Sequence, residues 1–398
     1  MDDRKASAVK TDDEIVERLL EIAETSAGDL GGEDPERVAV VVLRELLGRA
    51  ALFEAPATPV TVQFDLGAGR RRLGYRVAMG PGDGRVSAGW DAAPVARVRQ
   101  DLAELVRATY GSVAGGHHAT REVFLAEDPG PSTHEAGADW VLRRRAAVVA
   151  LHGLTKAAGA LRFDLDELAV RTGTDKWGGH WYTPQYGRHF EAYRDRRVKI
   201  LEIGVGGYNV PTAGGESLRM WKNYFRRGLV YGIDFFDKTA LAEPRIRVFR
   251  GDQSDPVFLA GVLDEIGTPD IVIDDGSHLC DHVLAAFRVL FPRLATGGLY
   301  VIEDLQSSYW PGWNGGRTGL DDPGTTTGFL KGLLDGLHHA EHADPPGRVK
   351  ADTDDSVTGM HVYHNIAFLE KGINSEQGAP SWIRKDVNPM DQMNAVGE

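Results

Sequence analysis

The second half of the chain repeats one pattern, in which a short apolar run is followed by a helix-like stretch. Five such runs occur, at residues 198–207, 229–236, 246–254, 269–278 and 298–305. Apolar runs that alternate with helices predict an α/β fold with a doubly wound, parallel, Rossmann-like sheet. In such a sheet, ligands bind beyond the carboxyl ends of the strands, and the acidic residues that end these runs all fall there. The sequence therefore predicts one ligand-binding edge in this half of the chain.

The first part of the chain has a different pattern, which predicts a smaller α+β domain. Helical periodicity occurs at 13–25, 37–52, 95–111 and 139–159, and strand-like runs occur at 59–66 and 71–80. The stretch 126–138 is rich in Pro, Gly and small polar residues, which is typical of a linker. We therefore expect an auxiliary or oligomerisation domain at 1–138 and the ligand-binding domain at 139–398.

Composition excludes several classes of protein. The net charge of −13 argues against a broad nucleic-acid-binding surface, which needs an excess of Lys and Arg. The one cysteine, Cys280, rules out a disulfide within the chain, and no apolar stretch approaches a membrane span. These features predict a cytoplasmic protein that binds neither nucleic acid nor membrane.

The end of the first apolar run predicts a nucleotide-like cofactor. Gly204 and Gly206 allow the backbone to turn tightly and to approach a ligand closely. Asp234 follows the second run, where a carboxylate can accept ribose hydroxyls, and Asp252 and Gln253 follow the third, where they can contact an adenine edge. The alternative is that each residue is an ordinary loop acid or a helix cap, as Ser254 or Asp255 is expected to be.

Two cofactors fit such a site, S-adenosylmethionine and NAD. Residues 204–209 lack the third glycine of a G-x-G-x-x-G run, which an NAD site prefers. Glu202 favours a ligand with a positive centre, and the sulfonium and ammonium of S-adenosylmethionine provide one. An NAD-dependent oxidoreductase and a non-catalytic ligand-binding scaffold remain as alternatives.

Carboxylates at the fourth and fifth strand ends predict a metal site. Asp275, Glu303 and Asp304 offer the oxygen ligands that Mg²⁺, Mn²⁺ or Ca²⁺ prefer. Glu303 and Asp304 converge only if the backbone has already left the strand, because neighbouring strand residues point to opposite faces. His278 is placed to remove a proton from a substrate hydroxyl, and Asp274 has no assigned role beyond orienting the turn.

The stretch 306–328 predicts a lid over this edge. It is long, rich in glycine and irregular, which is typical of a binding loop. Its aromatic residues Tyr309, Trp310 and Trp313 can stack on the flat faces of a sugar or a polyketide. The alternative is a disordered surface loop.

Several long motifs resemble one family. The stretches "RTGTDKWGGHWYTPQYGRHFEAYR", "LEIGVGGY", "GESLRMWK", "GDQSD", "IVIDDGSH", "GGLYVIEDL" and "HVYHNIAFLEKG" resemble the actinobacterial antibiotic-sugar O-methyltransferases, including those of mycinamicin and spinosyn biosynthesis. The resemblance implies a class I methyltransferase fold, S-adenosylmethionine as methyl donor, Mg²⁺, and a deoxysugar on a glycosylated polyketide as acceptor. It also implies a homotetramer.

The resemblance also assigns site residues. It implies that Asp275, Glu303 and Asp304 bind the metal and that His278 is the general base. It implies a cofactor pocket made of Thr174, Glu202, Gly204, Val205, Gly206, Tyr208, Ser217, Asp234, Asp252, Gln253 and Asp275. The chain has one residue fewer than its relatives between the glycines and the His-Trp of "WGGHW", which leaves the methylated sugar position open.

Overall fold

The computed structural model describes residues 12–391, apart from 25–28, 113–118, 128–133, 160–161, 317, 343–348, 376–377, 381–382, 384 and 389. The chain forms two compact units, and each is described by itself. The first consists of Met1–Arg197, Arg219–Leu229 and Ala242–Arg247, and the second of Val198–Leu218, Val230–Leu241 and Val248–Glu398. Of the predicted linker 126–138, residues 128–133 lie outside the described residues, and 134–138 form the start of α4 (His134–Ala157). The domain boundary at 138/139 stays a prediction.

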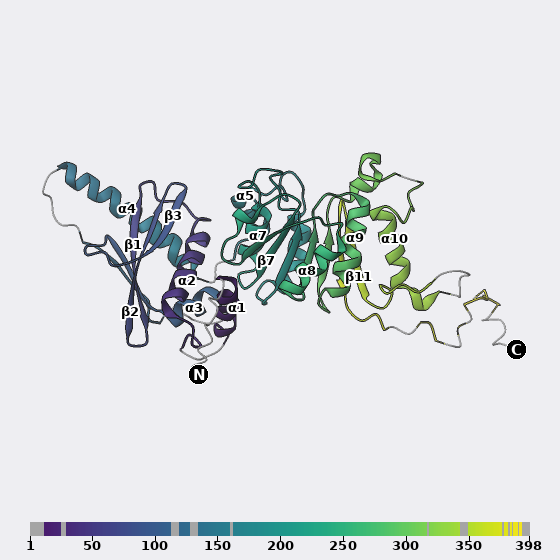
Figure 1. Ribbon diagram of the computed structural model, residues 1–398, viewed down its shortest axis with the longest axis horizontal. Helices are drawn as coiled ribbons and strands as arrows, with labels where there is room; N and C mark the ends of the chain where they lie inside the picture. Colours follow the sequence, from purple (N-terminus) through teal and green to yellow (C-terminus); the bar gives the residue numbers. More distant parts are fainter. Residues whose placement is uncertain are drawn as a thin grey trace, which may run out of the picture. The chain divides into compact units, whose positions relative to one another are not determined.

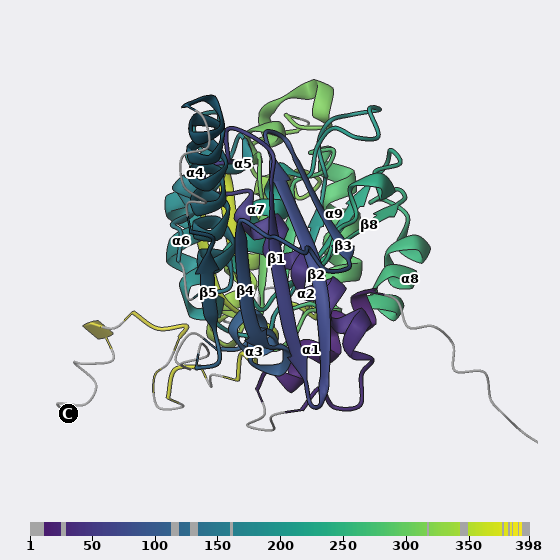
Figure 2. The same ribbon diagram turned by 90° about the vertical axis from the view of Figure 1, so that its left-hand side faces the viewer.

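The first unit contains a five-stranded sheet with the order β3-β2-β1-β4-β5. The strands are β1 (Val60–Ala68), β2 (Arg71–Gly80), β3 (Asp83–Ala88), β4 (Ala96–Asp101) and β5 (Glu122–Leu125). The helices are α1 (Asp12–Ile22), α2 (Pro35–Ala50), α3 (Leu102–Tyr110), α4 (His134–Ala157), α5 (Leu165–Thr172) and α6 (Thr183–Phe190). Helices α2 and α3 pack on one face of the sheet, and Figure 2 shows the strands side by side in this order.

The helix expected over 95–111 is wrong in its first half. Residues 96–101 form β4, which pairs in parallel with β1, and only the second half forms α3. Ala96, Val98 and Gln100 are buried while the residues between them are partly exposed, so the period of two prevails over the helical period. Asp101 ends the strand and caps α3, because its side chain accepts a hydrogen bond from the backbone N–H of Glu104.

A buried ionic cluster lies within the first unit. Glu45 of α2 is fully buried, and its Oε1 accepts hydrogen bonds from Arg49 Nε at 2.7 Å and from Arg245 Nε at 3.0 Å. Lys222 Nζ lies 3.4 Å from Glu45 Oε2, and the Lys222 and Arg245 side chains are at most 3% exposed. Burial acts to raise the pKa of Glu45, but the charges of Arg245, Lys222 and Arg49 together hold it well below its usual range. We call these four residues the Glu45 cluster.

The second sheet has the order β11-β12-β10-β9-β6-β7-β8. Its strands are β6 (Lys199–Ile203), β7 (Leu229–Asp234), β8 (Ile246–Arg250), β9 (Ile271–Asp274), β10 (Leu299–Ile302), β11 (Val357–Tyr363) and β12 (Ile366–Lys371). Strands β6, β9 and β10 are parallel, which confirms the predicted doubly wound sheet. The helices that follow its strands are α7 (Glu216–Tyr224), α8 (Pro256–Ile266), α9 (Cys280–Leu290) and α10 (Thr326–Leu337), and α9 packs against both α8 and α10 (Figure 1).

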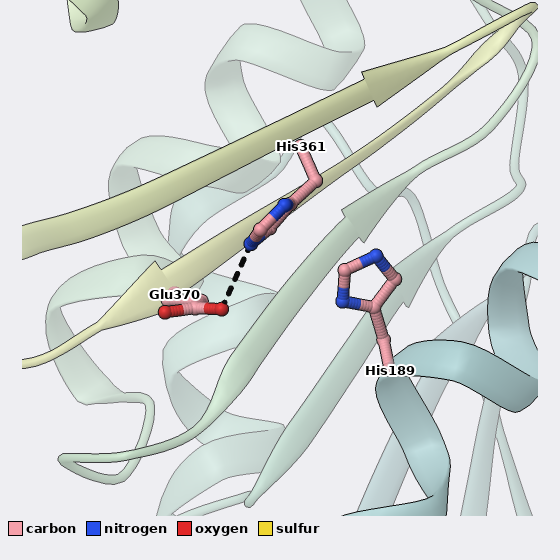
Figure 3. Close-up of side chains that lie close together, drawn as sticks. All are labelled: His189, His361 and Glu370. Carbon is pink, nitrogen blue, oxygen red and sulfur yellow. Dashed lines mark hydrogen bonds and ion pairs between the residues drawn. The ribbon is translucent and has the colours of Figure 1, made fainter.

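Strands β11 and β12, at one edge of this sheet, do not follow from the sequence analysis, whereas β8 at the other edge does. Strand β12 is antiparallel to β10, and β11 pairs with β12 as a hairpin. His361 of β11 and Glu370 of β12 face each other on the hairpin, with Nε2 and Oε1 2.9 Å apart (Figure 3). None of the described helices is both long enough and apolar enough to cross a membrane.

Candidate active site

Two neighbouring strand ends meet closely at the carboxyl edge of the second sheet. Strand β9 ends at Asp274, and the N–H of Asp275 donates to the carbonyl oxygen of Ile203 at 3.0 Å. Gly204 has φ +91°, and a Cβ at this position would lie 2.0 Å from the carbonyl oxygen of Asp275. Only glycine fits here, because both the backbone conformation and the space exclude a side chain. At Gly204 the two strand ends thus come into close contact, and the predicted approach of a ligand to this turn stays a prediction.

Three predicted residues come together just beyond β9 and β10. One ligand atom from each of Asp275, His278 and Asp304 lies within 4.8 Å of the other two. His278 Nε2 is 3.3 Å from Asp304 Oδ2. The two carboxylates offer the oxygen ligands that Mg²⁺, Mn²⁺ or Ca²⁺ prefer, and the imidazole lies beside them; all three residues are partly exposed.

Strand β10 ends before Asp304, so the side chain of Asp304 can point toward Asp275 and His278. Strand β10 ends at Ile302, and Asp304 has φ +53°. His278 also has a positive φ, +56°. A non-glycine residue with positive φ is strained and costs about 1–2 kcal/mol, so the surrounding fold has to hold both residues in place. Glu303 is almost fully buried, and the three-residue group does not include it.

Asp274 supports the turn that carries Asp275 and His278. Its side chain is 1% exposed, and burial raises its pKa to about 7. Gln253 Nε2 donates to Asp274 Oδ1 at 3.1 Å, and Gln253 Oε1 accepts the N–H of Ser277 at 2.7 Å. A Cβ at Gly276 would lie 2.1 Å from this oxygen, so the turn is fitted to Gln253. Sequence reasoning missed this link because no local pattern joins residue 253 to residues 274–277.

The predicted cofactor residues of the second unit lie on the same edge. Glu202 of β6 is fully buried, and Ser217 Oγ donates to its Oε2 at 2.9 Å. Asp234 accepts the N–H of Val205 at 2.9 Å and the N–H of Phe236 at 2.8 Å, so it fixes the start of the glycine turn. Gly206 has φ +78°, and Tyr208, with φ +46°, is exposed.

Asp252 and Asp255 lie in the turn between β8 and α8. The hydrogen bonds from the N–H and the hydroxyl of Ser254, both 2.8 Å long, hold the pKa of Asp252 below its usual value. Asp255 caps α8, as expected. Thr174 belongs to the first unit and is nearly buried, and its part in the cofactor pocket stays a prediction.

The predicted lid is partly structured. Short 3₁₀ helices form at Leu305–Tyr309 and Pro311–Trp313, and α10 already begins at Thr326, so the expectation of an irregular loop is wrong for these parts. Tyr309, Trp310 and Trp313 are at least 40% exposed. The two tryptophan rings contact each other edge to face, with centroids 5.3 Å apart. Residue 317 of this stretch lies outside the described residues.

Comparisons with known proteins show which family the chain is similar to. A family model described as "MycE methyltransferase N-terminal" matches residues 16–121. Demethylmacrocin O-methyltransferase of Streptomyces fradiae is 40% identical over 96% of this chain and 98% of that protein. Mycinamicin VI 2''-O-methyltransferase of Micromonospora griseorubida is 38% identical over 92% of this chain and 91% of that protein.

A solved structure covers nearly the whole chain. The MycE methyltransferase of the mycinamycin biosynthetic pathway, in complex with Mg and SAH, is 36% identical and superposes with a TM-score of 0.85. The match covers 98% of this chain and 100% of that one. Another structure of the same enzyme contains Mg, SAH and mycinamycin VI.

The doubly wound sheet, its carboxylate-lined edge and these matches define the class of the protein, which is an O-methyltransferase. Within this class, the chain belongs to the family of sugar O-methyltransferases that includes the demethylmacrocin and mycinamicin VI enzymes. The resemblance based on the sequence motifs is thereby confirmed.

Proposed function

We propose that the chain transfers a methyl group from S-adenosylmethionine to a hydroxyl of a deoxysugar on a glycosylated polyketide, and that it requires Mg²⁺. The observation that carries this proposal is the group Asp275, His278 and Asp304, which lies on the same strand edge as the Gly204 turn. A methyl donor and a metal-bound acceptor have to be adjacent for the transfer. The related MycE structures contain Mg and SAH, and SAH is what remains of the donor after methyl transfer.

The metal would be held by Asp275 and Asp304, while Glu303 stays a predicted ligand. When bound, Mg²⁺ lowers the pKa of an acceptor hydroxyl and neutralises the negative charge that develops on it. His278 Nε2 lies 3.3 Å from Asp304 Oδ2, so the imidazole is adjacent to a proposed metal ligand. This position suits His278 for taking the hydroxyl proton near neutral pH.

The transfer makes one bond, breaks one bond and moves one proton. The sugar oxygen forms a bond to the methyl carbon, the carbon–sulfur bond of the donor breaks, and S-adenosylhomocysteine leaves. The hydroxyl proton goes to His278. The buried carboxylate of Glu202 and the hydroxyl of Ser217 line the donor side, where a positively charged ligand is stabilised. Much of the rate would come from positioning.

The acceptor would rest against the exposed aromatic residues of the lid, Tyr309, Trp310 and Trp313, which offer flat apolar faces to a sugar or macrolide ring. The mycinamycin VI complex of the related enzyme supports an acceptor of this kind. The homotetramer and the cytoplasmic location remain predictions from the sequence.

Calorimetry with S-adenosylhomocysteine and with NADH, each with and without Mg²⁺, tests the proposal, followed by turnover of a glycosylated macrolide with labelled donor. We expect S-adenosylhomocysteine to bind and NADH not to bind. Turnover should be lost when EDTA removes the metal. Tight NADH binding with no effect of the metal would support the oxidoreductase instead. Donor binding without methyl transfer to any glycosylated acceptor would support a scaffold.

A further inference from the structure

Lys238 is a buried cation next to the proposed donor site, and no sequence motif points to it. It follows β7, four residues after Asp234, and its residue is 0% exposed. Burial of an ammonium group is costly unless hydrogen bonds replace its water shell. In the described part of the chain, Lys238 has no carboxylate partner, and both of its hydrogen bonds go to backbone carbonyl oxygens.

Both carbonyl groups belong to one loop. Lys238 Nζ donates to the carbonyl oxygen of Val210 at 2.7 Å and to that of Ala213 at 2.8 Å. These residues lie in the stretch 204–215, which connects the end of β6 to α7 and begins with the glycine turn of the proposed donor site. Lys238 therefore joins the segment after β7 to the far half of the loop after β6.

Backbone hydrogen bonds also hold this loop, from the N–H of Val210 to Gly207, of Ala213 to Val210 and of Gly215 to Val205, and Lys238 is the buried side chain that adds to them. The loop contains five glycines with positive φ, and residues 208–212 at its tip are exposed. Its two limbs pack backbone against backbone: a Cβ at Gly207 would lie 2.3 Å from the carbonyl group of Ala213, and a Cβ at Gly214 would lie 2.4 Å from the carbonyl oxygen of Gly206. A segment so rich in glycine has high conformational entropy when it is not held in place. The hydrogen bonds from Lys238 therefore strongly affect which conformation the loop adopts.

We propose that Lys238 is a positioning residue that holds the 204–215 loop in the conformation that binds the methyl donor. Asp234 fixes the beginning of the loop through the N–H of Val205, and Lys238 fixes its far half. The inference rests on the proposed function, because it takes this loop as part of the donor site. It predicts that loss of Lys238 weakens donor binding and leaves the chemical step almost unchanged.

The chain offers a matched control. Lys371, at the end of β12, also donates to two backbone carbonyl oxygens, those of Pro292 and Leu294, each at 2.7 Å. Its neighbour Glu370 pairs with Leu299 at the start of β10, so Lys371 lies at the sheet edge opposite the carboxylate group. Lys371→Met thus removes the same kind of contact away from the donor site.

The test measures the binding of S-adenosylhomocysteine by calorimetry and turnover at saturating donor. If the fraction of molecules whose loop can bind the donor falls to about a tenth or a hundredth of its wild-type value, the apparent Kd in Lys238→Met rises about 10-fold to 100-fold. We expect kcat within a factor of about 3 of the wild type, since the loop is again ordered when the donor saturates. Lys371→Met should bind the donor like the wild type.

Three results overturn the inference: wild-type donor affinity in Lys238→Met, a loss of kcat with unchanged affinity, or an equal loss of affinity in Lys371→Met. Failure of the wild-type chain itself to bind S-adenosylhomocysteine would instead refute the proposed function.

A second measurement needs no variant, in case Lys238→Met does not fold. Lysine acetylation of the wild-type chain is followed by mass spectrometry with and without S-adenosylhomocysteine. If donor binding and the Lys238 contacts reinforce each other, the donor must slow acetylation at Lys238, because such coupling is reciprocal. Lys371 should be unaffected. Equal acetylation of Lys238 in both conditions would contradict the inference.

Discussion

Glu45→Gln is expected to cause a large loss of stability, although residue 45 lies far along the chain from the acidic strand ends. The substitution keeps the size of the side chain and removes its charge. Glu45 Oε1 accepts hydrogen bonds from Arg49 and Arg245, and Lys222 lies 3.4 Å from Oε2. With glutamine at position 45, Arg49 and Arg245 lose this counter-charge, Lys222 keeps only Glu243, at 3.1 Å, among the described acids, and the new amide N–H₂ group faces further donors.

The magnitude follows from burial. None of the four side chains in the Glu45 cluster is more than 6% exposed. Breaking a buried ion pair by removal of one partner costs about 3–5 kcal/mol, because the remaining charge stays buried without compensation. The exposed pair Glu36–Arg71 gives the control, since both side chains are more than half exposed. Glu36→Gln should change the free energy of unfolding by about 0–1 kcal/mol.

Urea unfolding at pH 7, followed by circular dichroism, measures both variants. The pH dependence gives a second check. Because the folded-state pKa of Glu45 is lowered, its contribution is fully present above the unfolded pKa of about 4.3 and is lost as the pH falls below it. The difference between wild type and Glu45→Gln should therefore shrink in acid. A Glu45→Gln variant within about 1 kcal/mol of the wild type at pH 7 would refute the reasoning, since that is the range of an exposed pair.

Three further predictions concern the candidate active site. His278→Gln should lower kcat by about 10²–10⁴-fold, the usual contribution of a general base, while calorimetry shows unchanged S-adenosylhomocysteine affinity; full turnover would mean that another group takes the proton. Asp304→Asn should raise the Mg²⁺ concentration needed for half-maximal turnover, because one of the two grouped carboxylates loses its charge, and an unchanged metal titration would exclude Asp304 as a ligand. Gly204→Ala should lower the unfolding midpoint and abolish donor binding, since its Cβ would overlap the carbonyl oxygen of Asp275; a stable variant that binds the donor would show that the two strand ends are free to separate.

The sequence predicts the central strands of the second sheet well, because each strand can be recognised from its own residues. Strands β6 to β10 are short apolar runs between helices, so each one is visible without knowledge of its neighbours. The same reading misassigns 95–101, because Val95, Val98 and Leu102 also fit a helical period, and only pairing with β1 decides for the strand. The β11–β12 hairpin follows the central strands after a long interval and pairs antiparallel, which the alternating pattern does not predict.

The candidate site was predicted as a set of strand ends, and its finer arrangement was not. The grouping of Asp275 with Asp304 follows from the adjacency of parallel strands, which spacing along the chain implies. The group includes Asp304 but not Glu303. The place of Asp304 in it depends on a positive φ at residue 304. The role of Asp274 depends on Gln253, whose side chain reaches from the end of β8 to the turn after β9. Such contacts are set by the folded chain and leave no periodic trace in the sequence.

The Glu45 cluster limits which segments can be exchanged between this chain and its relatives. Its acid comes from α2, near the start of the chain, and two of its bases come from residues 222 and 245, in the middle of the strand–helix pattern. A chain that begins at residue 139 would retain the buried Lys222 and Arg245 without Glu45, and of the acids that the structure describes Lys222 would keep only Glu243 as a partner. A chimera that takes its first 138 residues from a relative would have to inherit a matching acid and bases together. The N-terminal segment and the 219–247 region are thus expected to be exchanged between relatives as one unit, even though a hundred or more residues separate them.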